Sequence, residues 1–318
     1  MKIGLHVNAV TFTDKSWSEV CSIVQGLGLE AIEPGTGGFV GKNHCNPQLL
    51  LKERESLERF VETLTSHELE LSALSCHGNP LHPDQCIARE HEDDLDASVE
   101  LASKLGVRIV NCFSGSPGLD DDARYPAWIT TRWPEEFEKG LKWQWERKIL
   151  PFWERKVKKA REAGIKYGFE MHPGDSIYNP EALLRLREAL GADEISCNLD
   201  PSHLFWQGIN PIVVIKRLGK AIVHVHAKDT EIDRSIMEFK GVNTEALFGD
   251  LGSRAWTFRV VGRGHDRIFW KAFVDELRMI GYEHVLSIEH EDPYIHAEEG
   301  IEEAAQFLGH ILDDKGTT

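Results

Sequence analysis

The sequence is short of positive charge, of long apolar runs and of paired cysteines. Its 318 residues include 36 lysines and arginines against 52 acidic residues, which gives a net charge of −16. Such a surface repels phosphate backbones and anionic lipids, so we expect neither nucleic acid nor a membrane as a partner. No apolar run approaches the ~20 residues of a membrane-spanning helix. The six cysteines contain no CxxC pair.

A secretion signal is missing as well. The N-terminus reads MKIGLHVNAV, which enters a strand pattern at once and has neither an apolar signal region nor a cleavage site. Several cysteines lie in apolar, strand-like runs, as reduced core thiols do. We therefore expect a cytoplasmic protein.

The sequence also lacks a glycine-rich phosphate loop after its first apolar run, where it reads His6-Val7-Asn8-Ala9. An open, doubly wound nucleotide-binding sheet usually carries such a loop. Instead, eight short apolar runs are each followed by a helix-like segment, with no evident linker. This pattern predicts a single-domain (β/α)8 TIM barrel over residues 1–318. The expected strands are 2–7, 29–33, 70–76, 107–113, 165–170, 194–200, 221–227 and 284–289.

Two segments interrupt this alternation. Residues 114–134 are rich in Gly, Pro and Trp and predict a lid or rim insertion, and 230–261 predicts an irregular insertion. Pro34-Gly35 is expected to break the second strand. Pro151 lies inside a long helical pattern, so we expect a kink or a break there.

The last four expected strands each end in a side chain that can bind a metal ion. These are Glu170, Asp200, His226 and Glu289. Strand ends of a barrel point to a common mouth, where active sites lie. A single carboxylate at a strand end is usually a helix cap or a solvated group, but four consecutive units with the same feature are hard to obtain by chance. Two glutamates, one aspartate and one histidine suit Mn²⁺, Mg²⁺ or Co²⁺ and suit a closed structural zinc site badly.

Five motifs together resemble a known family. FEMHP, NLDPSH, HVHAKD, GRGHD and SIEHED are similar, in the same order, to signatures of the xylose-isomerase-like TIM barrels, the sugar phosphate isomerases and epimerases. The resemblance covers nearly the whole chain and is strongest over 167–291. This family is related to the ketose 3-epimerases and to the catalytic subunit of C-glycoside deglycosidases. No basic cluster marks a phosphate site, so a phosphorylated substrate is not expected.

The resemblance implies that Glu170, Asp200, His226 and Glu289 hold one divalent metal ion. Mn²⁺ is the expected ion, with Mg²⁺, Co²⁺ and Zn²⁺ as alternatives. Glu170 and Glu289 are also expected to act as acid and base on opposite sides of a sugar. His172 is either a catalytic base or a histidine that fixes Glu170.

Further residues are expected to contact the substrate. They are His203, Lys228, Arg263, His265 and His77. For Arg263 an ion pair with Asp266 inside its own loop is an equal alternative. His224 is expected to be a hydrogen-bonded core imidazole, and Asp229 is expected to cap a turn or to pair with Lys228.

These residues predict a metal-dependent sugar isomerase or epimerase that removes a proton next to a sugar carbonyl. The alternative is a lyase that cleaves 3-keto C- or O-glycosides by elimination, with a small β-rich partner subunit; the long 114–153 and 230–261 segments favour it. A third hypothesis, a non-catalytic sugar-binding barrel, is disfavoured by the intact ligand set. Barrels of this kind often pair, so a homo-oligomer is expected by analogy.

Overall fold

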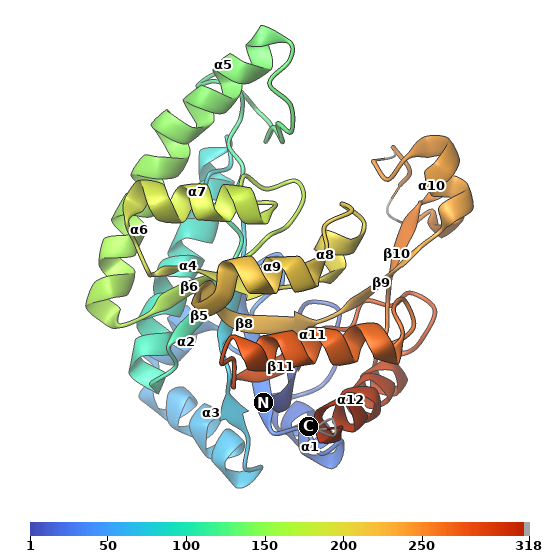
Figure 1. Ribbon diagram of the computed structural model, residues 1–318. Coiled ribbons are helices and arrows are strands. Elements are labelled where there is room, and N and C mark those ends of the chain that lie inside the picture. The colour runs from blue at the N-terminus through green and yellow to red at the C-terminus, as the bar shows by residue number, and fades with distance from the viewer. Residues whose placement is uncertain (244, 248, 315–318) are drawn as a thin grey trace.

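The computed structural model describes residues 1–243, 245–247 and 249–314, and its centre is a closed barrel of eight parallel strands (Figure 1). Strand β1 (Lys2–Val7) pairs with both β2 (Ala31–Gly38) and β11 (Val285–Ile288), which closes the barrel. The strands between them are β4 (Leu74–His77), β5 (Ile109–Cys112), β6 (Lys166–Glu170), β7 (Ile195–Leu199) and β8 (Ile222–Ala227). A short segment, β3 (Glu70–Leu71), pairs with β2 and is the first part of the third barrel strand. The predicted TIM barrel is confirmed.

Helices surround the barrel. They are α1 (Trp17–Gly26), α2 (Pro47–Lys52), α3 (Arg54–Ser66), α4 (Gln85–Leu105), α6 (Leu150–Ala163), α7 (Pro180–Leu190), α8 (Ser202–Phe205), α9 (Pro211–Leu218), α11 (Arg267–Met279) and α12 (Ala297–Asp313), with short 3-10 turns at Gly219–Ala221 and Leu251–Ser253. Their ends follow from local sequence. Asn179 caps α7 through the Ala182 N–H, Pro180 begins the helix, and Gly191 ends it in the left-handed conformation. Among the described residues, no helix is long and apolar enough to cross a bilayer.

Alternation along the strands separates an apolar outer face from a polar interior. In β6, Tyr167 and Phe169 pack against Trp153 of α6, with ring centroids 5.3 and 4.5 Å apart. The residues between and after them, Gly168 and Glu170, therefore point into the barrel. A Cβ at Gly168 would lie 2.2 Å from the Asn111 amide oxygen, so the packed interior needs a glycine there. This alternation directs the polar side chains of the strands toward the barrel axis.

The expected break of the second strand at Pro34-Gly35 is wrong, because β2 continues to Gly38. Pro34 is the last residue to pair with β1, and the register with β4 shifts between Gly35 and Gly37. Proline is tolerated at such an irregularity because the sheet does not need a backbone N–H from that position. The strand passes close to α4 at Gly37, where a Cβ would lie 2.5 Å from the Asp94 side chain.

The expected kink near Pro151 is confirmed as a change of helix type. Helix α5 (Glu135–Trp143) runs into a π-helical segment, η1 (Gln144–Ile149), and α6 begins at Leu150. Proline has no N–H for the α-helical bond, so the chain widens into a π-helical turn directly before it.

The expectation of an irregular 230–261 insertion is wrong. Strands β9 (Asp229–Ile232) and β10 (Trp256–Arg259) form an antiparallel ribbon, and α10 (Arg234–Lys240) lies at its far end, away from the barrel (Figure 1). Trp256, which pairs with Ile232 at the end of the ribbon next to α10, stacks on Trp206 with centroids 4.6 Å apart, and this contact holds the ribbon against α8. The two short strands are separated by more than twenty residues, so no local sequence pattern predicts that they pair. Residues 114–134 hold no helix or strand, as expected. Residues 244, 248 and 315–318 of the expected segments lie outside the described residues.

Candidate active site

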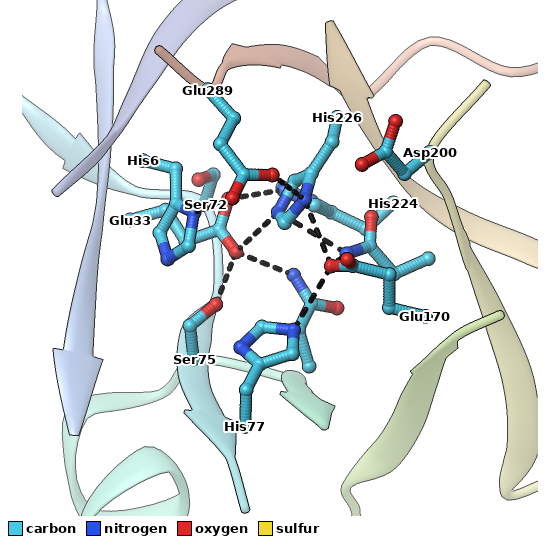
Figure 2. Close-up of polar contacts among 12 residues, drawn as sticks. His6, Glu33, Ser72, Ser75, His77, Glu170, Asp200, His224, His226 and Glu289 are labelled. Carbon is cyan, nitrogen blue, oxygen red and sulfur yellow. Dashed lines mark hydrogen bonds and ion pairs between the residues drawn. The ribbon is translucent and has the colours of Figure 1, made fainter. Parts of the chain in front are cut away.

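Four side chains from four neighbouring strands meet at the mouth of the barrel. Glu170 ends β6, Asp200 follows β7, His226 lies near the end of β8, and Glu289 follows β11. Each offers one ligand atom, and these four atoms all lie within 4.8 Å of one another. All four side chains are buried, and Figure 2 shows them gathered at one point. The structure thus brings together the four residues that the sequence singled out.

Three atoms of this cluster are left without a hydrogen bond. His226 Nδ1, Asp200 Oδ2 and Glu289 Oε2 are buried, and none meets a partner with hydrogen-bond geometry among the described residues. His226 Nδ1 lies 2.8 Å from Glu289 Oε2 and 3.1 Å from Glu170 Oε2. Buried polar atoms are nearly always paired, so a group of three unpaired ones indicates a missing ligand. Three carboxylates and one imidazole around a common point fit a divalent cation.

Cationic neighbours keep the two glutamates ionised. Burial raises the pKa of Glu289, but Lys228 and His226 lower it more, so it lies well below its ordinary value. Burial likewise raises the pKa of Glu170, and nearby histidines, His77 first, bring it well below the ordinary value. Burial raises the pKa of Asp200 to about 6, although His203 and Lys228 oppose the shift.

Lys228 is almost fully buried beside these carboxylates. Its ammonium lies 3.3 Å from Glu289 Oε1 and 2.5 Å from Glu291 Oε2. Phe258 of β10 covers it, with the ring centroid 4.2 Å from Nζ. Burial lowers the pKa of Lys228, but the two glutamates raise it more, so the ammonium stays charged.

Two of the expected histidines hold Glu170. His203 Nε2 lies 3.1 Å from Glu170 Oε1, and His77 Nε2 lies 3.1 Å from Glu170 Oε2. His203 also lies 3.3 Å from Asp200 Oδ2. These contacts place both histidines at the cluster.

His172 lies beside the cluster with a defined tautomer. Its Nδ1–H donates to the Pro173 carbonyl at 2.7 Å, which leaves the lone pair on Nε2. Its ring is 4.3 Å from that of His203, and burial lowers its pKa to about 3, so the ring is neutral. His203 and His77, each with Nε2 3.1 Å from a Glu170 oxygen, are the histidines in contact with this carboxylate.

A cavity opens above the cluster. It is lined by Asn8, Ala9, Val10, Phe39, Val40, His77, Phe113, Glu170, His172, His203, Lys228, Glu289 and Glu291. The Phe113 ring contacts His77 and His172, with centroids 4.6 and 4.7 Å apart. One wall is therefore aromatic and the floor is charged, which suits a polar molecule with an apolar face.

The structure does not bring Arg263 and His265 to this cavity, which corrects their expected role as substrate contacts. Arg263 makes two hydrogen bonds to Glu303, at 2.8 and 2.7 Å, with both side chains exposed. His265 Nδ1 lies 2.8 Å from Asp229 Oδ1, and its ring stacks on Phe205. Neither residue lines the cavity, and Asp266 caps α11 rather than pairing with Arg263.

The GRGHD turn is instead built around Asp229. Asp229 Oδ2 accepts the backbone N–H groups of Gly262, Gly264 and His265 and the indole N–H of Trp270. A Cβ at Gly264 would lie 2.4 Å from the Thr230 carbonyl oxygen, so this close turn requires glycine. Asp229 therefore caps a turn, which is the first of the two roles expected from the sequence.

Sequence reasoning missed two buried residues below the cluster. Glu33 Oε1 lies 3.0 Å from His226 Nε2, and Glu33 Oε2 lies 2.7 Å from His224 Nε2. His6 stacks on His226, with centroids 4.8 Å apart, and its Nδ1 lies 3.7 Å from Glu289 Oε1. His224 is the buried, hydrogen-bonded imidazole that the sequence predicted. The available signal was one titratable residue in each of two apolar runs, His6 in LHV and Glu33 at the end of AIE.

The family model described as "Xylose isomerase-like TIM barrel" matches residues 22–311. The uncharacterized protein YfiH of Bacillus subtilis is 39% identical over 285 residues, which cover 89% of this chain and 90% of YfiH. An inosose dehydratase of Clostridium botulinum is 31% identical over 43% of this chain and 44% of its own length. Among solved structures, the IolI protein with a binding zinc atom superposes with a TM-score of 0.66 at 21% identity, over all of both chains. The chain therefore belongs to the xylose isomerase-like TIM barrel family, as its five motifs indicated.

Proposed function

We propose that this protein is a divalent-metal-dependent sugar isomerase or epimerase that moves a proton at the carbon next to a sugar carbonyl. The observation that carries the proposal is the pair of glutamates on either side of His226. Glu170 Oε2 and Glu289 Oε2 lie 3.1 and 2.8 Å from the same imidazole nitrogen, and they come from different strands. Two carboxylates that flank one point can serve opposite faces of one substrate.

Glu170, Asp200, His226 and Glu289 would hold the metal ion. When bound, a divalent cation withdraws electron density from a carbonyl and its neighbouring hydroxyl, which stabilises the negative charge that develops as the adjacent carbon loses its proton. Oxygen-rich donors favour Mn²⁺, with Mg²⁺ and Co²⁺ as alternatives. The zinc atom of IolI makes Zn²⁺ a further candidate.

The two glutamates would carry the proton. Both have pKa values below the ordinary range, so at neutral pH each is a carboxylate that can accept a proton. In the reacting state one glutamate is ionised and takes the proton from the substrate carbon, while the other has first taken up a proton from water and returns that proton to the substrate; exchange of one proton with water then resets the pair. Return to the opposite face of that carbon gives an epimer, and return to the neighbouring carbon gives the aldose–ketose isomer.

The remaining cavity residues would orient the sugar. Lys228 keeps its charge and can donate to a hydroxyl or to the developing oxyanion. His172 is neutral, and its free Nε2 can accept a hydrogen bond from a hydroxyl. His203 and His77 hold Glu170 in place and border the same cavity. Phe113 offers an apolar ring to the C–H face of a sugar.

A second candidate is elimination, with loss of a group β to the carbanion. The similarity to an inosose dehydratase favours it, because dehydration begins with the same proton abstraction. In this case Lys228 would protonate the departing oxygen, which leaves as water or as the aglycone of a 3-keto O-glycoside. The same residues serve both reactions, so the products must separate them.

NMR-detected deuterium exchange tests the proposal. The protein would be stripped with a chelator, reloaded with Mn²⁺ and incubated in D₂O with ketoses, aldoses, cyclic keto-polyols and 3-keto glycosides. We expect metal-dependent deuterium incorporation next to the carbonyl together with an epimer or isomer. Unsaturated products or a released aglycone would instead establish elimination. No metal-dependent exchange across the panel would reject both reactions.

A further inference from the structure

Polar side chains from three strands converge on Glu33 beneath the four candidate metal ligands (Figure 2). The Glu33 carboxylate accepts from Asn111 Nδ2 at 2.7 Å, from His224 Nε2 at 2.7 Å and from the Ser75 hydroxyl. His226 Nε2 lies 3.0 Å from the same carboxylate. Glu33 itself is fully buried in β2, and its partners lie on β4, β5 and β8. The Glu33 carboxylate thus links β2 to three other strands beneath the four candidate metal ligands.

The position of Glu33 calls for more than a packing role. Burying a carboxylate costs free energy that its partners at best offset, and apolar residues of similar volume usually stabilise a core at least as well. The proposed reaction does not need Glu33 to touch the substrate, because the cavity lining does not include it. Its closest link to the chemistry is His226.

The geometry shows what this link does. An uncharged imidazole carries one N–H and one lone pair, and a carboxylate on one nitrogen fixes where each lies. Glu33 and the Asn198 amide face Nε2 of His226, at 3.0 and 3.1 Å, so a neutral, metal-ligating His226 would carry its N–H on Nε2, toward the carboxylate, and its lone pair on Nδ1. Nδ1 is the atom that lies 3.1 Å from Glu170 and 2.8 Å from Glu289. In that form the imidazole would present its lone pair to the candidate metal position.

We infer that Glu33 is a positioning residue that fixes the tautomer and ring orientation of His226 as a metal ligand. Ser75, Asn111 and His224 hold the carboxylate so that it cannot turn away. The same arrangement, a carboxylate behind a ligating histidine, strengthens the histidine as a donor in other metal sites. The inference rests on the proposed function, because it assigns a role within the proposed metal site.

Metal affinity of Glu33→Gln tests the inference independently of turnover. Mn²⁺ binding to the chelator-stripped protein would be measured by isothermal titration calorimetry, and the fold by circular dichroism and thermal unfolding. We expect Mn²⁺ affinity to fall about 10- to 100-fold in Glu33→Gln. The matched control is Asp94→Asn, which also neutralises a buried carboxylate but one bonded to Lys42 and Gln48, away from the cluster. It should lose stability and keep its Mn²⁺ affinity.

A second variant keeps the inference testable if Glu33→Gln does not fold. Ser75→Ala removes one donor from Glu33 without touching His226, and we expect a smaller but measurable loss of Mn²⁺ affinity. If Glu33→Gln folds and binds Mn²⁺ as tightly as wild type, the inference is overturned and the proposed metal site stays intact. If Glu33→Gln does not fold, the same holds for a Ser75→Ala variant whose Mn²⁺ affinity equals that of wild type. Failure of the wild-type protein to bind Mn²⁺, Mg²⁺, Co²⁺ or Zn²⁺ would overturn the proposed function and this inference together.

Discussion

His226 Nδ1 lies 2.8 Å from Glu289 Oε2, and neither atom meets a partner with hydrogen-bond geometry among the described residues. The two residues come from adjacent strands, β8 and β11, whose carboxyl ends meet at the barrel mouth. Carboxylates and an imidazole crowded this closely out of water cost folding free energy unless a cation joins them. The pair therefore indicates that the mouth is organised around a ligand.

Metal removal should lower the melting temperature. A cation that binds only the folded protein stabilises it by about 2.7 kcal/mol at a hundredfold excess over its Kd, which corresponds to a rise of about 4 °C for a chain of this size. Thermal unfolding with Mn²⁺ and with a chelator measures the difference. The shift should vanish in His226→Asn, and a shift that persists there would place the metal elsewhere.

Glu170→Gln and Glu289→Gln should each lower kcat by about 10²–10⁴-fold, because each variant removes a proton carrier. The substitutions keep the shape of the side chain, so the circular dichroism spectrum should match that of wild type. Turnover would be measured on the substrate identified by deuterium exchange. An active Glu289→Gln variant would remove this residue from the proposed mechanism.

Arg263→Gln should leave turnover unchanged. The Arg263–Glu303 pair is exposed on both sides, so its loss should cost less than about 1 kcal/mol. Steady-state kinetics with the same substrate and a melting curve provide the measurement. A substantial rise in KM would show that Arg263 reaches the substrate after all.

The strand ends could be predicted because the alternation in each strand is local. In the eighth strand, Ile288 is buried in the barrel wall and Glu289 follows it, so sequence alone placed the carboxylate at the mouth. The same local reasoning found Glu170, Asp200 and His226. The kink or break expected at Pro151 was also placed locally, because a proline disturbs a helix at its own position; the π-helical form of the irregularity was not predicted.

Glu33 could not be predicted because its partners are distant in the sequence. Its carboxylate meets Asn111 and His224, 78 and 191 residues away. A single charged residue before Pro34 looks the same whether it ends a strand or lies inside the barrel. Arg263 was misassigned for the same reason, since only the folded chain brings Asp229 to the GRGHD turn and turns Arg263 toward Glu303.

Asp229→Asn should destabilise the fold by on the order of 3 kcal/mol. The amide nitrogen of asparagine would face N–H donors that now bind carboxylate oxygens, including those of Gly262, Gly264 and Trp270. Chemical denaturation measures the loss. Asp266→Asn is the control, because asparagine caps a helix as well as aspartate, and it should change stability by less than about 0.5 kcal/mol.

Asp175→Asn should stabilise the protein at alkaline pH and not at acidic pH. Burial raises the pKa of Asp175 to about 7, so the folded state prefers the protonated carboxyl. In the unfolded chain the group ionises near pH 4. The folded state therefore holds an extra proton between about pH 4 and pH 7, and wild-type stability falls as the pH rises through this window.

The asparagine amide does not ionise in this pH range, so the stability of the variant does not decrease as the pH rises. By pH 8 the advantage of Asp175→Asn should reach on the order of 2–4 kcal/mol, and it should be small at pH 4. Urea denaturation of both proteins at pH 4, 6 and 8 measures the trend. A difference in stability that does not change with pH would mean that Asp175 ionises in the folded protein as freely as in the unfolded chain.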